Sequence, residues 1–531
     1  MQQQCTLKLL PAEAASASIV QQYAASHFSV PVSSISGYHI LKQSIDARSR
    51  QPWILLTIRV FINEPFVERS HLQLALQDVS KAPHKVIVVG AGPAGLFAAL
   101  KLIEAGIQPI LLERGKDVRS RRRDLAQLNK EGIINPESNY CFGEGGAGTY
   151  SDGKLYTRST KRGDVNRILN ILVQFGAEDK ILYDAHPHVG TNKLPQIITA
   201  MREKIVDCGG VFLFEKKVTD LILHDNSITA VKTADGDRFD GAAVILATGH
   251  SARDIFILLH EKNILIEAKP FALGVRIEHP QQLIDSIQYH CNTRDALLPP
   301  ASYSLVQQVD ERGVFSFCMC PGGIIAPAAT SAGELVVNGW SPSKRNNPFA
   351  NSGMVVSVEL QDIAAAGNKK GMISKNGLQN PLSGMYFQQA VEKKAFEYGG
   401  GKFVAPAQRM ADFVDQKVSA SLPDNSYLPG LNAAPLNEVL PGFVHYALKN
   451  AFREFGKKMK GYFTNEAVVV ATESRTSSPV RIPRDPETLQ HPQVSGLYPC
   501  AEGAGYAGGI VSAAMDGERV VDEIVKVLNK N

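Results

Sequence analysis

Two hydrophobic patterns alternate along most of this chain of 531 residues. Short runs rich in Val, Ile and Leu are typical of buried strands, and stretches in which apolar residues recur every three or four positions are typical of amphipathic helices. Their alternation predicts an α/β fold. The expected strands are residues 86–89, 109–113, 211–215, 219–223, 228–233, 243–247 and 496–500, and the expected helices are 94–105, 196–208 and 509–528.

Changes in this pattern predict how the chain is divided into domains. Near the N-terminus, three strand-like runs (6–10, 39–45 and 53–62) and one helical stretch (12–26) indicate a small module of its own. A later region has scattered Gly, Pro and Asn and fewer buried strands, which indicates an inserted domain. We therefore expect an N-terminal α/β module (1–83), an α/β domain in two parts (84–270 and 461–531), and an inserted α+β domain (271–460).

A glycine motif follows the first strand of the α/β domain. Gly90, Gly92 and Gly95 form G-x-G-x-x-G between an apolar strand and a helix, and Glu113 ends the next strand. In a dinucleotide-binding unit the first glycine allows the tight turn, the second lets the backbone approach a pyrophosphate, and the third lets helix and strand pack closely. The helix N-terminus attracts phosphate, and Glu113 would accept hydrogen bonds from a ribose. An acid at this position argues against a 2′-phosphate on that ribose.

A second glycine-rich turn lies near the end of the chain. Gly503, Gly505 and Gly508 repeat the spacing of the first motif, but the residues after them form one helix and leave no room for a further strand with a ribose-binding acid. We expect this turn to complete the first site instead. Glu502 would reach a polyol hydroxyl, Gly503 would lie against phosphate, and the helix after Gly509 would point its N-terminus at an electron-rich ring. This arrangement resembles flavoproteins of the glutathione-reductase type and favours FAD over NAD.

Two further segments agree with an FAD site. Residues 243–250 (AVILATGH) resemble the Ala-Thr-Gly turn that ends a strand near the dinucleotide in such flavoproteins. Residues 142–153 contain five glycines, and such density lets the main chain lie flat against a planar ring. We call residues 143–153 the glycine cluster.

Longer motifs make the resemblance more specific. The segments FGEGGAGTYSDGKL, AHPHVGTNKL, FCMCPGGIIAPA, NGWSPSKRNNPFANS, ESRTSSPVRIPRD and QSIDAR are similar to those of the bacterial uncharacterised FAD-dependent dehydrogenase family. The resemblance covers nearly the whole chain and implies a Rossmann-like FAD-binding domain, bound FAD and oxidoreductase chemistry, without a settled substrate. The residues expected to bind FAD are Gly90, Gly92, Pro93, Ala94, Gly95, Glu113, Arg114, Gly145, Gly146, Ala147, Gly148, Thr149, Val218, Thr248, Gly249, Glu502, Gly503, Gly509 and Ile510.

Three residues are candidates for a part in catalysis. Lys154 and Glu144 flank the densest glycines, and Lys154 could place positive charge beside a reduced flavin, although a solvated lysine is equally compatible with the sequence. Arg475 could bind a substrate carboxylate, with a structural salt bridge as the alternative. FAD itself would do the redox chemistry.

The sequence offers weaker signals for thiol and metal chemistry. Cys318 and Cys320 are two positions apart, which strains a disulfide, so we expect buried thiols more than a redox pair. His186 and His188 lack further clustered ligands, so we expect a turn with hydrogen-bonded imidazoles and no metal.

Composition and charge bear on partners and location. The 56 Lys and Arg against 52 Asp and Glu leave a formal charge of +4, which gives little support to nucleic-acid binding. The run Arg119, Arg121, Arg122 and Arg123 is expected to be a solvated surface, with an FAD-binding RNA-modifying or RNA-binding factor as the alternative function. Seven scattered cysteines and the absence of a signal or membrane-spanning stretch predict a cytoplasmic protein without a membrane partner. The flavin would be reduced by transient NAD(P)H, by substrate or by an electron-donor protein.

Overall fold

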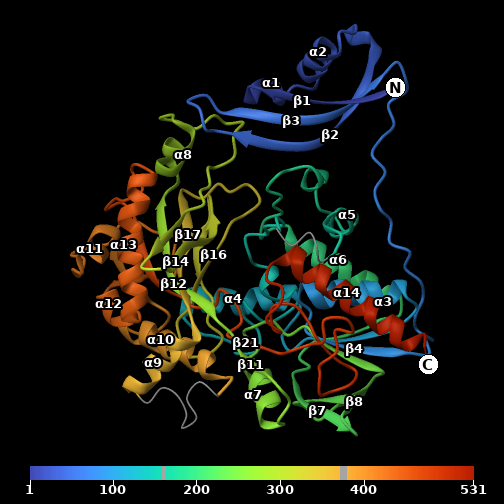
Figure 1. The fold of residues 1–531 in the computed structure, drawn as a ribbon, viewed down its shortest axis with the longest axis vertical. Coiled ribbons are helices and arrows are strands. Elements are labelled where there is room, and N and C mark those ends of the chain that lie inside the picture. Colours follow the sequence, from blue (N-terminus) through green and yellow to red (C-terminus); the bar gives the residue numbers. More distant parts are fainter. Residues whose placement is uncertain (158–162, 371–379, 531) are drawn as a thin grey trace.

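The computed structural model describes residues 1–157, 163–370 and 380–530. Figure 1 shows three regions: a small sheet with two helices at the N-terminal end, a parallel sheet with α3 and α14 near the C-terminus, and a larger sheet covered on its outer side by α11, α12 and α13. None of the helices in the described ranges is both long and apolar enough to span a bilayer.

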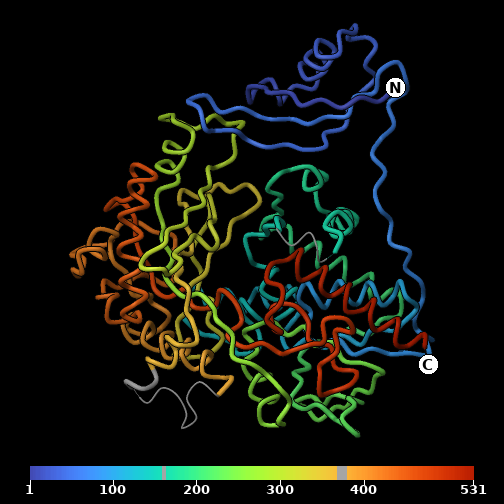
Figure 2. Tube along the Cα trace, in the orientation of Figure 1, coloured from blue at the N-terminus to red at the C-terminus, as the bar shows by residue number. Residues whose placement is uncertain are grey.

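The N-terminal residues form a three-stranded sheet with two helices. Its three strands are all antiparallel and stand in the order β1-β3-β2. Residues 63–84 then run as an extended connection down one side of the molecule to the parallel sheet (Figure 2). The module also touches residues 183–185, because the backbone N–H of Gln43 donates to the Tyr183 carbonyl at 2.7 Å. Its elements are β1 (Gln2–Leu9), α1 (Pro11–Ala14), α2 (Ala17–Phe28), η1 (Val32–Ser34), β2 (Ile35–Asp46) and β3 (Trp53–Ile62).

A five-stranded parallel sheet forms the centre of the Rossmann-like domain. Its order is β22-β10-β4-β5-β6, and every neighbouring pair is parallel. β22 comes from the far end of the chain and pairs with β10, as expected of a domain built from two separate segments. The strands are β4 (Lys85–Val89), β5 (Gln108–Leu112), β6 (Val211–Leu213), β10 (Ala243–Leu246) and β22 (Leu497–Pro499), and the main helices are α3 (Pro93–Glu104), α6 (Leu194–Asp207) and α14 (Ile510–Leu528).

Two of the expected strands lie outside this parallel sheet. The segments 219–223 and 228–233 belong to a separate antiparallel sheet of β7 (Val218–His224), β8 (Ser227–Thr233) and β9 (Arg238–Asp240). Hydrophobic pattern marks a segment as a strand but does not say which sheet it joins.

The inserted domain is built on a mostly antiparallel seven-stranded sheet. Its order is β13-β14-β17-β12-β20-β18-β19. β20 hydrogen-bonds to both β12 and β18, so the domain extends to Glu473, and the expected boundary at 460 is corrected. The apolar residues of this strand do not show by themselves which domain it joins. The strands are β12 (Phe271–Pro280), β13 (Val306–Val309), β14 (Arg312–Cys320), β17 (Phe349–Val358), β18 (Ala405–Arg409), β19 (Leu431–Ala433) and β20 (Val468–Glu473).

Helices and short elements complete the two larger domains. The helices of the inserted domain are α8 (Gln281–Tyr289), α9 (Leu360–Lys370), α10 (Ser383–Gly399), α11 (Met410–Asp415), α12 (Leu436–Val439) and α13 (Gly442–Lys458). The remaining elements are α4 (Val118–Glu131), η2 (Gly146–Gly148), α5 (Val165–Gln174), η4 (Asp179–Leu182), α7 (Arg253–Glu261), β11 (Glu267–Ala268), β15 (Ile324–Pro327), β16 (Val337–Trp340) and β21 (Val480–Arg481).

Candidate flavin site and domain junction

The turn between β4 and α3 requires its glycines for two different reasons. Gly90 has φ +104°, and a Cβ there would lie 2.6 Å from the carbonyl oxygen of Ala247. A Cβ at Gly95 would lie 1.9 Å from the carbonyl oxygen of Gly90. A Cβ at Gly92 would meet no protein atom within 4 Å, although Gly92 caps the N-terminus of α3. Gly90 and Gly95 are therefore needed for packing, and Gly92 borders open space where a helix N-terminus can receive phosphate.

Glu113 ties the turn to the glycine cluster. Its carboxylate is 4% exposed and accepts hydrogen bonds at 2.9 Å from the backbone N–H groups of Ala91, Gly115 and Gly143. A carboxylate has about four acceptor positions, so one remains for a ribose hydroxyl. That ribose contact stays a prediction.

The three glycine-rich segments meet in space. The backbone N–H of Gly145 donates to the Ala91 carbonyl at 2.8 Å. A Cβ at Gly148 would lie 3.2 Å from Cγ of Pro93 and 3.7 Å from Cγ1 of Ile510. The glycine cluster therefore lies between the start of α3 and the start of α14, as a shared cofactor site requires.

The fourth segment meets the C-terminal turn. A Cβ at Gly503 would lie 2.9 Å from the backbone nitrogen of Gly249, and Thr248 lies directly beside Gly90. Burial raises the pKa of Glu502, whose carboxylate accepts from the Ser478 backbone N–H at 2.9 Å. Its expected contact with a polyol hydroxyl remains a proposal.

A close helix crossing holds α14 against the start of α3. A Cβ at Gly517 in α14 would lie 2.3 Å from the carbonyl oxygen of Ala94 in α3, so only glycine allows this crossing. Gly509 begins α14 with φ +94°. The first turn of α3 therefore packs against the third turn of α14.

Arg121 is an unexpected support of the cluster. Its side chain is fully buried and donates at 2.8–3.0 Å to four backbone carbonyls, those of Asn139, Tyr140, Glu144 and Gly146. The expectation that the whole arginine run is solvated is therefore wrong for this member, while Arg122 is exposed. A signal was present in the sequence, because position 121 shares a helical face with the apolar Leu125 and Leu128.

The other expected cofactor residues lie around this core. Arg114 pairs with Glu137 and Asp254 and stacks over the Phe142 ring at 4.1 Å. Ala147 lies in the short helix η2 within the cluster. Thr149 is buried and donates to the Glu144 carbonyl at 2.6 Å, and Val218 is buried at the start of β7. Their contact with a cofactor stays a prediction.

Glu144 has structural contacts that its proposed catalytic role does not explain. The carboxylate is fully buried, accepts from the Val118 backbone N–H at 2.7 Å and pairs with Nε of Arg202 at 3.0 Å. Burial raises its pKa. These contacts connect the glycine cluster to α4 and α6.

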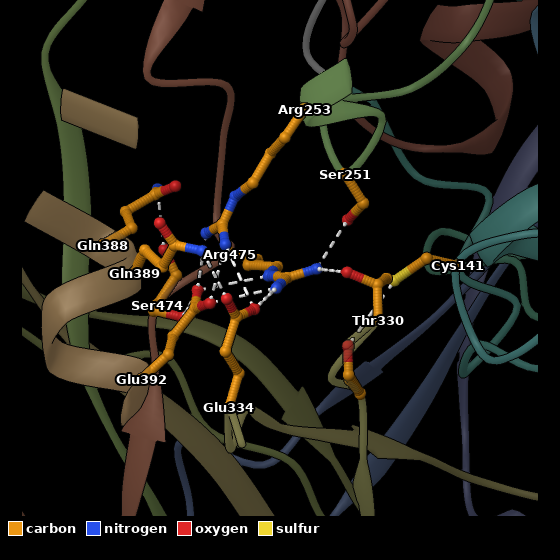
Figure 3. A network of polar contacts seen from close by, with 11 residues as sticks. Cys141, Ser251, Arg253, Thr330, Glu334, Gln388, Gln389, Glu392, Ser474 and Arg475 are labelled. Carbon is orange, nitrogen blue, oxygen red and sulfur yellow. Dashed lines mark hydrogen bonds and ion pairs between the residues drawn. The ribbon is translucent and has the colours of Figure 1, made fainter. Parts of the chain in front are cut away.

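Arg475 lies in a buried ion-pair network between the two domains (Figure 3). Its guanidinium pairs with Glu392 at 2.9 Å and Glu334 at 3.2 Å, and Arg253 of α7 pairs with the same two carboxylates. The Arg475 side chain is 5% exposed. The structural salt bridge, which we left open as an alternative, is therefore what these contacts form. The hypothesis of a substrate clamp is corrected, because both carboxylates already occupy the guanidinium.

Lys154 reaches the inserted domain directly after the glycine cluster. Its ammonium donates to the Met319 carbonyl and lies 3.4 Å from Sγ of Cys318 and 3.6 Å from Oδ2 of Asp152. Burial alone would lower the pKa of Lys154, but the neighbouring sulfurs and Asp152 raise it above its usual range. The ammonium is therefore charged and held at the junction of the two domains.

The two histidines have different surroundings. Burial lowers the pKa of His188 to about 4, and its Nε2 lies 3.8 Å from Asp152. The His186 ring lies 5.2 Å from that of Tyr156. In the described parts of the chain no three His, Cys, Asp or Glu side chains cluster as metal ligands would.

Together, the open space at Gly92, the buried Glu113 and the converging glycine segments fit a dinucleotide with a planar ring. The fold and the site therefore define a Rossmann-like FAD-binding protein.

Comparison with known families gives the same assignment for separate parts of the chain. Residues 84–137 match an FAD binding domain, 195–276 match glucose inhibited division protein A, and 270–476 match the C-terminal domain-like region of FAD-dependent proteins. Residues 1–61 match a domain of unknown function.

Similar proteins place the whole chain in a family. An uncharacterized protein of Clostridium beijerinckii is 39% identical over 510 residues, covering 93% of each chain. The FAD-dependent monooxygenase DEP2 of Fusarium langsethiae is 27% identical over 175 residues, 32% of this chain and 30% of its own. The chain belongs to the family of FAD-dependent oxidoreductases that includes the Clostridium protein.

Solved structures show only distant overall likeness. The 2,6-dihydroxypyridine-3-hydroxylase of Arthrobacter nicotinovorans aligns over 84% of both chains with a TM-score of 0.37 and 10% identity. Glycine oxidase of Bacillus cereus aligns over 84% of this chain and 95% of its own, with a TM-score of 0.31 and 12% identity.

Proposed function

We propose that this FAD-dependent oxidoreductase oxidises or reduces a small molecule at the junction between the flavin-binding and inserted domains. Bound FAD supplies the two-electron chemistry. Gly92 and the N-termini of α3 and α14 would hold its phosphates and ring, and Glu113 and Glu502 would accept from its hydroxyls.

One observation supports the proposed position of the substrate site. The glycine cluster leads without interruption into Lys154, and the ammonium of Lys154 contacts the inserted sheet at Met319 and Cys318. The chain that would lie against the flavin is therefore continuous with a charged contact between the two domains. Ligand sites occur preferentially at such domain interfaces.

Two further hydrogen bonds connect the flavin-binding domain to the inserted domain at this junction. The N–H of Thr191 donates to the Ser341 carbonyl at 3.2 Å, and the N–H of Ser343 donates to Oδ1 of Asn192 at 2.7 Å. These bonds join the residues just before α6 to the inserted domain and would exclude water from part of the interface.

The electron source is tested by anaerobic stopped-flow spectroscopy of the FAD-loaded protein. If nicotinamide is the donor, NADH or NADPH bleaches the flavin absorbance within the turnover time. If neither does, transient reduction by NAD(P)H is excluded, and substrate or an electron-donor protein must reduce the flavin.

The substrate is tested by anaerobic reoxidation or reduction of the flavin with a panel of small metabolites. An active metabolite should lose kcat/KM in Lys154→Met without loss of bound FAD, whereas exposed Glu397→Gln should change neither. If no small molecule exchanges electrons with the flavin, the proposal of a small-molecule substrate fails.

The alternative of an RNA-modifying or RNA-binding factor has no support in the described residues. Arg121 of the basic run supports the glycine cluster from inside. Elution from heparin tests the alternative directly, since phosphate binding weakens steeply with salt.

A further inference from the structure

Two cysteines of the inserted sheet lie at the domain junction. Cys318 and Cys320 are two positions apart on β14, and their Sγ atoms are 3.8 Å apart without a disulfide. Cys318 is partly exposed and Cys320 is fully buried. The pairing of β14 with β17 shifts register between Ser316 and Cys318, so the strand is irregular beside the first thiol.

A cation lies beside each sulfur atom. Nζ of Lys154 is 3.4 Å from Sγ of Cys318, and Nη2 of Arg276 is 3.3 Å from Sγ of Cys320. The same nitrogen of Arg276 also donates to the Cys318 carbonyl at 3.0 Å. Such positive surroundings stabilise a thiolate. They also oppose a bound metal ion, because the ion would be repelled by both side chains.

The charges around the thiols leave one positive charge in excess. Arg345 pairs with Asp152 at 3.4 Å, and Nη1 of Arg276 donates to both carboxylate oxygens of Glu473 at 2.7 and 2.8 Å. His188 is neutral, because burial lowers its pKa to about 4. Lys154 and Arg276 lie beside the thiols, and Asp152, Glu473 and Arg345 pair with one another or with these two cations. Burial raises the pKa of Glu473 to about 7, which lowers its negative charge at neutral pH. A thiolate at Cys318 reduces the resulting positive excess.

The two cysteines are not equivalent. The hydrogen bond from the Cys320 thiol lowers the pKa of Cys318 well below its usual range, and Lys154 and Arg276 lower it further against the opposing effect of burial. The same hydrogen bond and burial raise the pKa of Cys320. The thiolate is thus the more exposed of the two sulfurs.

We propose that Cys318 and Cys320 form a dithiol–disulfide couple that exchanges with a small disulfide, with Cys318 as the attacking thiolate and Cys320 as the resolving thiol. This reaction is separate from the proposed conversion at the flavin and needs no electron from it.

The exchange balances as follows for a disulfide RSSR. The Cys318 thiolate bonds to one sulfur, the S–S bond breaks, and the leaving RS⁻ takes up the proton of the Cys320 thiol. Cys320 then attacks Sγ of Cys318, and the second RS⁻ leaves and is protonated by solvent. Two cysteines are oxidised to one disulfide and RSSR is reduced to two RSH. The sulfurs must approach from 3.8 Å to a bond of about 2.05 Å, which the irregular strand has to absorb.

The test uses the full-length FAD-loaded protein and neutral bis(2-hydroxyethyl) disulfide. After reaction, free thiols are alkylated and the peptides are weighed by mass spectrometry. The wild type should lose only the thiols of Cys318 and Cys320, in one peptide lighter by two hydrogens and without a lasting adduct. If another cysteine reacts first, or if the adduct on Cys318 is never released, the couple is refuted.

Variants separate the two sulfurs. Cys320→Ser should retain a mixed disulfide on Cys318, and Cys318→Ser should leave Cys320 unmodified. Cys291→Ser, at a half-buried thiol after α8, should react like the wild type. Absence of an adduct in folded Cys320→Ser would overturn the order of attack, and the wild-type result decides the case if this variant does not fold.

The pH profile tests Lys154 as a positioning residue. Lys154→Met should slow the reaction of Cys318 about tenfold at neutral pH and move the midpoint of its rate–pH curve upward. Exposed Lys393→Met is the matched control. An unchanged midpoint in Lys154→Met would show that the ammonium does not stabilise the thiolate.

Discussion

The two sides of the flavin site are held by different kinds of contact. The glycine cluster is fixed by backbone hydrogen bonds, by close approaches that only glycine allows, and by Arg121 donating to neutral carbonyls. The domain junction is fixed by charged side chains, with two arginines against two carboxylates at Arg475 and three cations against two carboxylates near Cys318. The contacts of the glycine cluster suit a rigid surface that binds a ligand. The contacts of the domain junction favour a charged thiolate that can react.

The domain junction also contains two clusters of charged side chains that differ in net charge. Around Arg475 the charges cancel, and both carboxylates are within 3% of full burial. Around Lys154 they do not cancel, and the compensating group is a thiol. The network around Arg475, in which the charges cancel, stabilises the contact between the domains. The excess positive charge around Lys154 stabilises a reactive thiolate.

Removing a carboxylate from the balanced network should have the largest effect. Glu392→Gln would leave Arg253 and Arg475 with Glu334 as their one carboxylate partner, and an uncompensated buried charge costs about 3–5 kcal/mol. Urea denaturation should show this loss in the free energy of unfolding. Glu397→Gln on the exposed side of α10 should stay within about 0.5 kcal/mol of wild type. Equal effects in both variants would contradict a structural role for the network.

On the other side of the site, Arg121→Met should disrupt the glycine cluster. Four buried or part-buried carbonyls would lose the Arg121 donor, at a cost of about 2–4 kcal/mol in unfolding free energy together with loss of bound FAD. The measurements are urea denaturation and the flavin-to-protein absorbance ratio. Its exposed neighbour provides the control, since Arg122→Met should leave both unchanged.

Gly92→Ala should separate cofactor binding from stability. The added Cβ meets no protein atom within 4 Å, so the apoprotein should unfold like the wild type, but FAD affinity should fall about tenfold, or ~1.4 kcal/mol. Fluorescence titration of apoprotein with FAD measures this. Gly442→Ala, at the exposed start of α13 with equally open space, should bind FAD normally. Normal binding in Gly92→Ala would place the phosphates elsewhere.

Glu278 offers the most selective test of charge at the junction sheet. It lies on β12 near Arg276, accepts from Ser426, and burial raises its pKa to about 7. The carboxyl of Glu278 ionises at lower pH in the unfolded chain than in the folded one, so the free energy of unfolding falls as pH rises from about 4.5 to about 7. Urea midpoints of wild type should therefore fall over this window relative to Glu278→Gln. Parallel pH curves for the two proteins would show that folding does not raise the pKa of Glu278.

The sequence predicts much of the local structure. The strand before Gly90, the helices at α3 and α14 and the three N-terminal strands follow from apolar periodicity and turn residues, whose effects act within a few positions. The glycine spacing likewise predicts where backbone must approach a phosphate or another segment.

Contacts between residues far apart in the sequence could not be predicted from these local patterns. The placement of β20 in the inserted sheet depends on hydrogen bonds to β12 and β18, which any apolar strand could make. Whether Arg475 binds a ligand or a carboxylate of its own chain depends on Glu392, 83 positions away.

The sequence by itself determined the class of fold and the cofactor motif, because both depend on the spacing of apolar and glycine residues over short stretches of the chain. Only the tertiary structure decided which charges face which partners. It buried Arg121 under the glycine cluster, and it brought Lys154 to Cys318 across 164 positions. These contacts matter because the groups are buried. A charged side chain removed from water is costly unless neighbouring side chains pair with it or form hydrogen bonds to it.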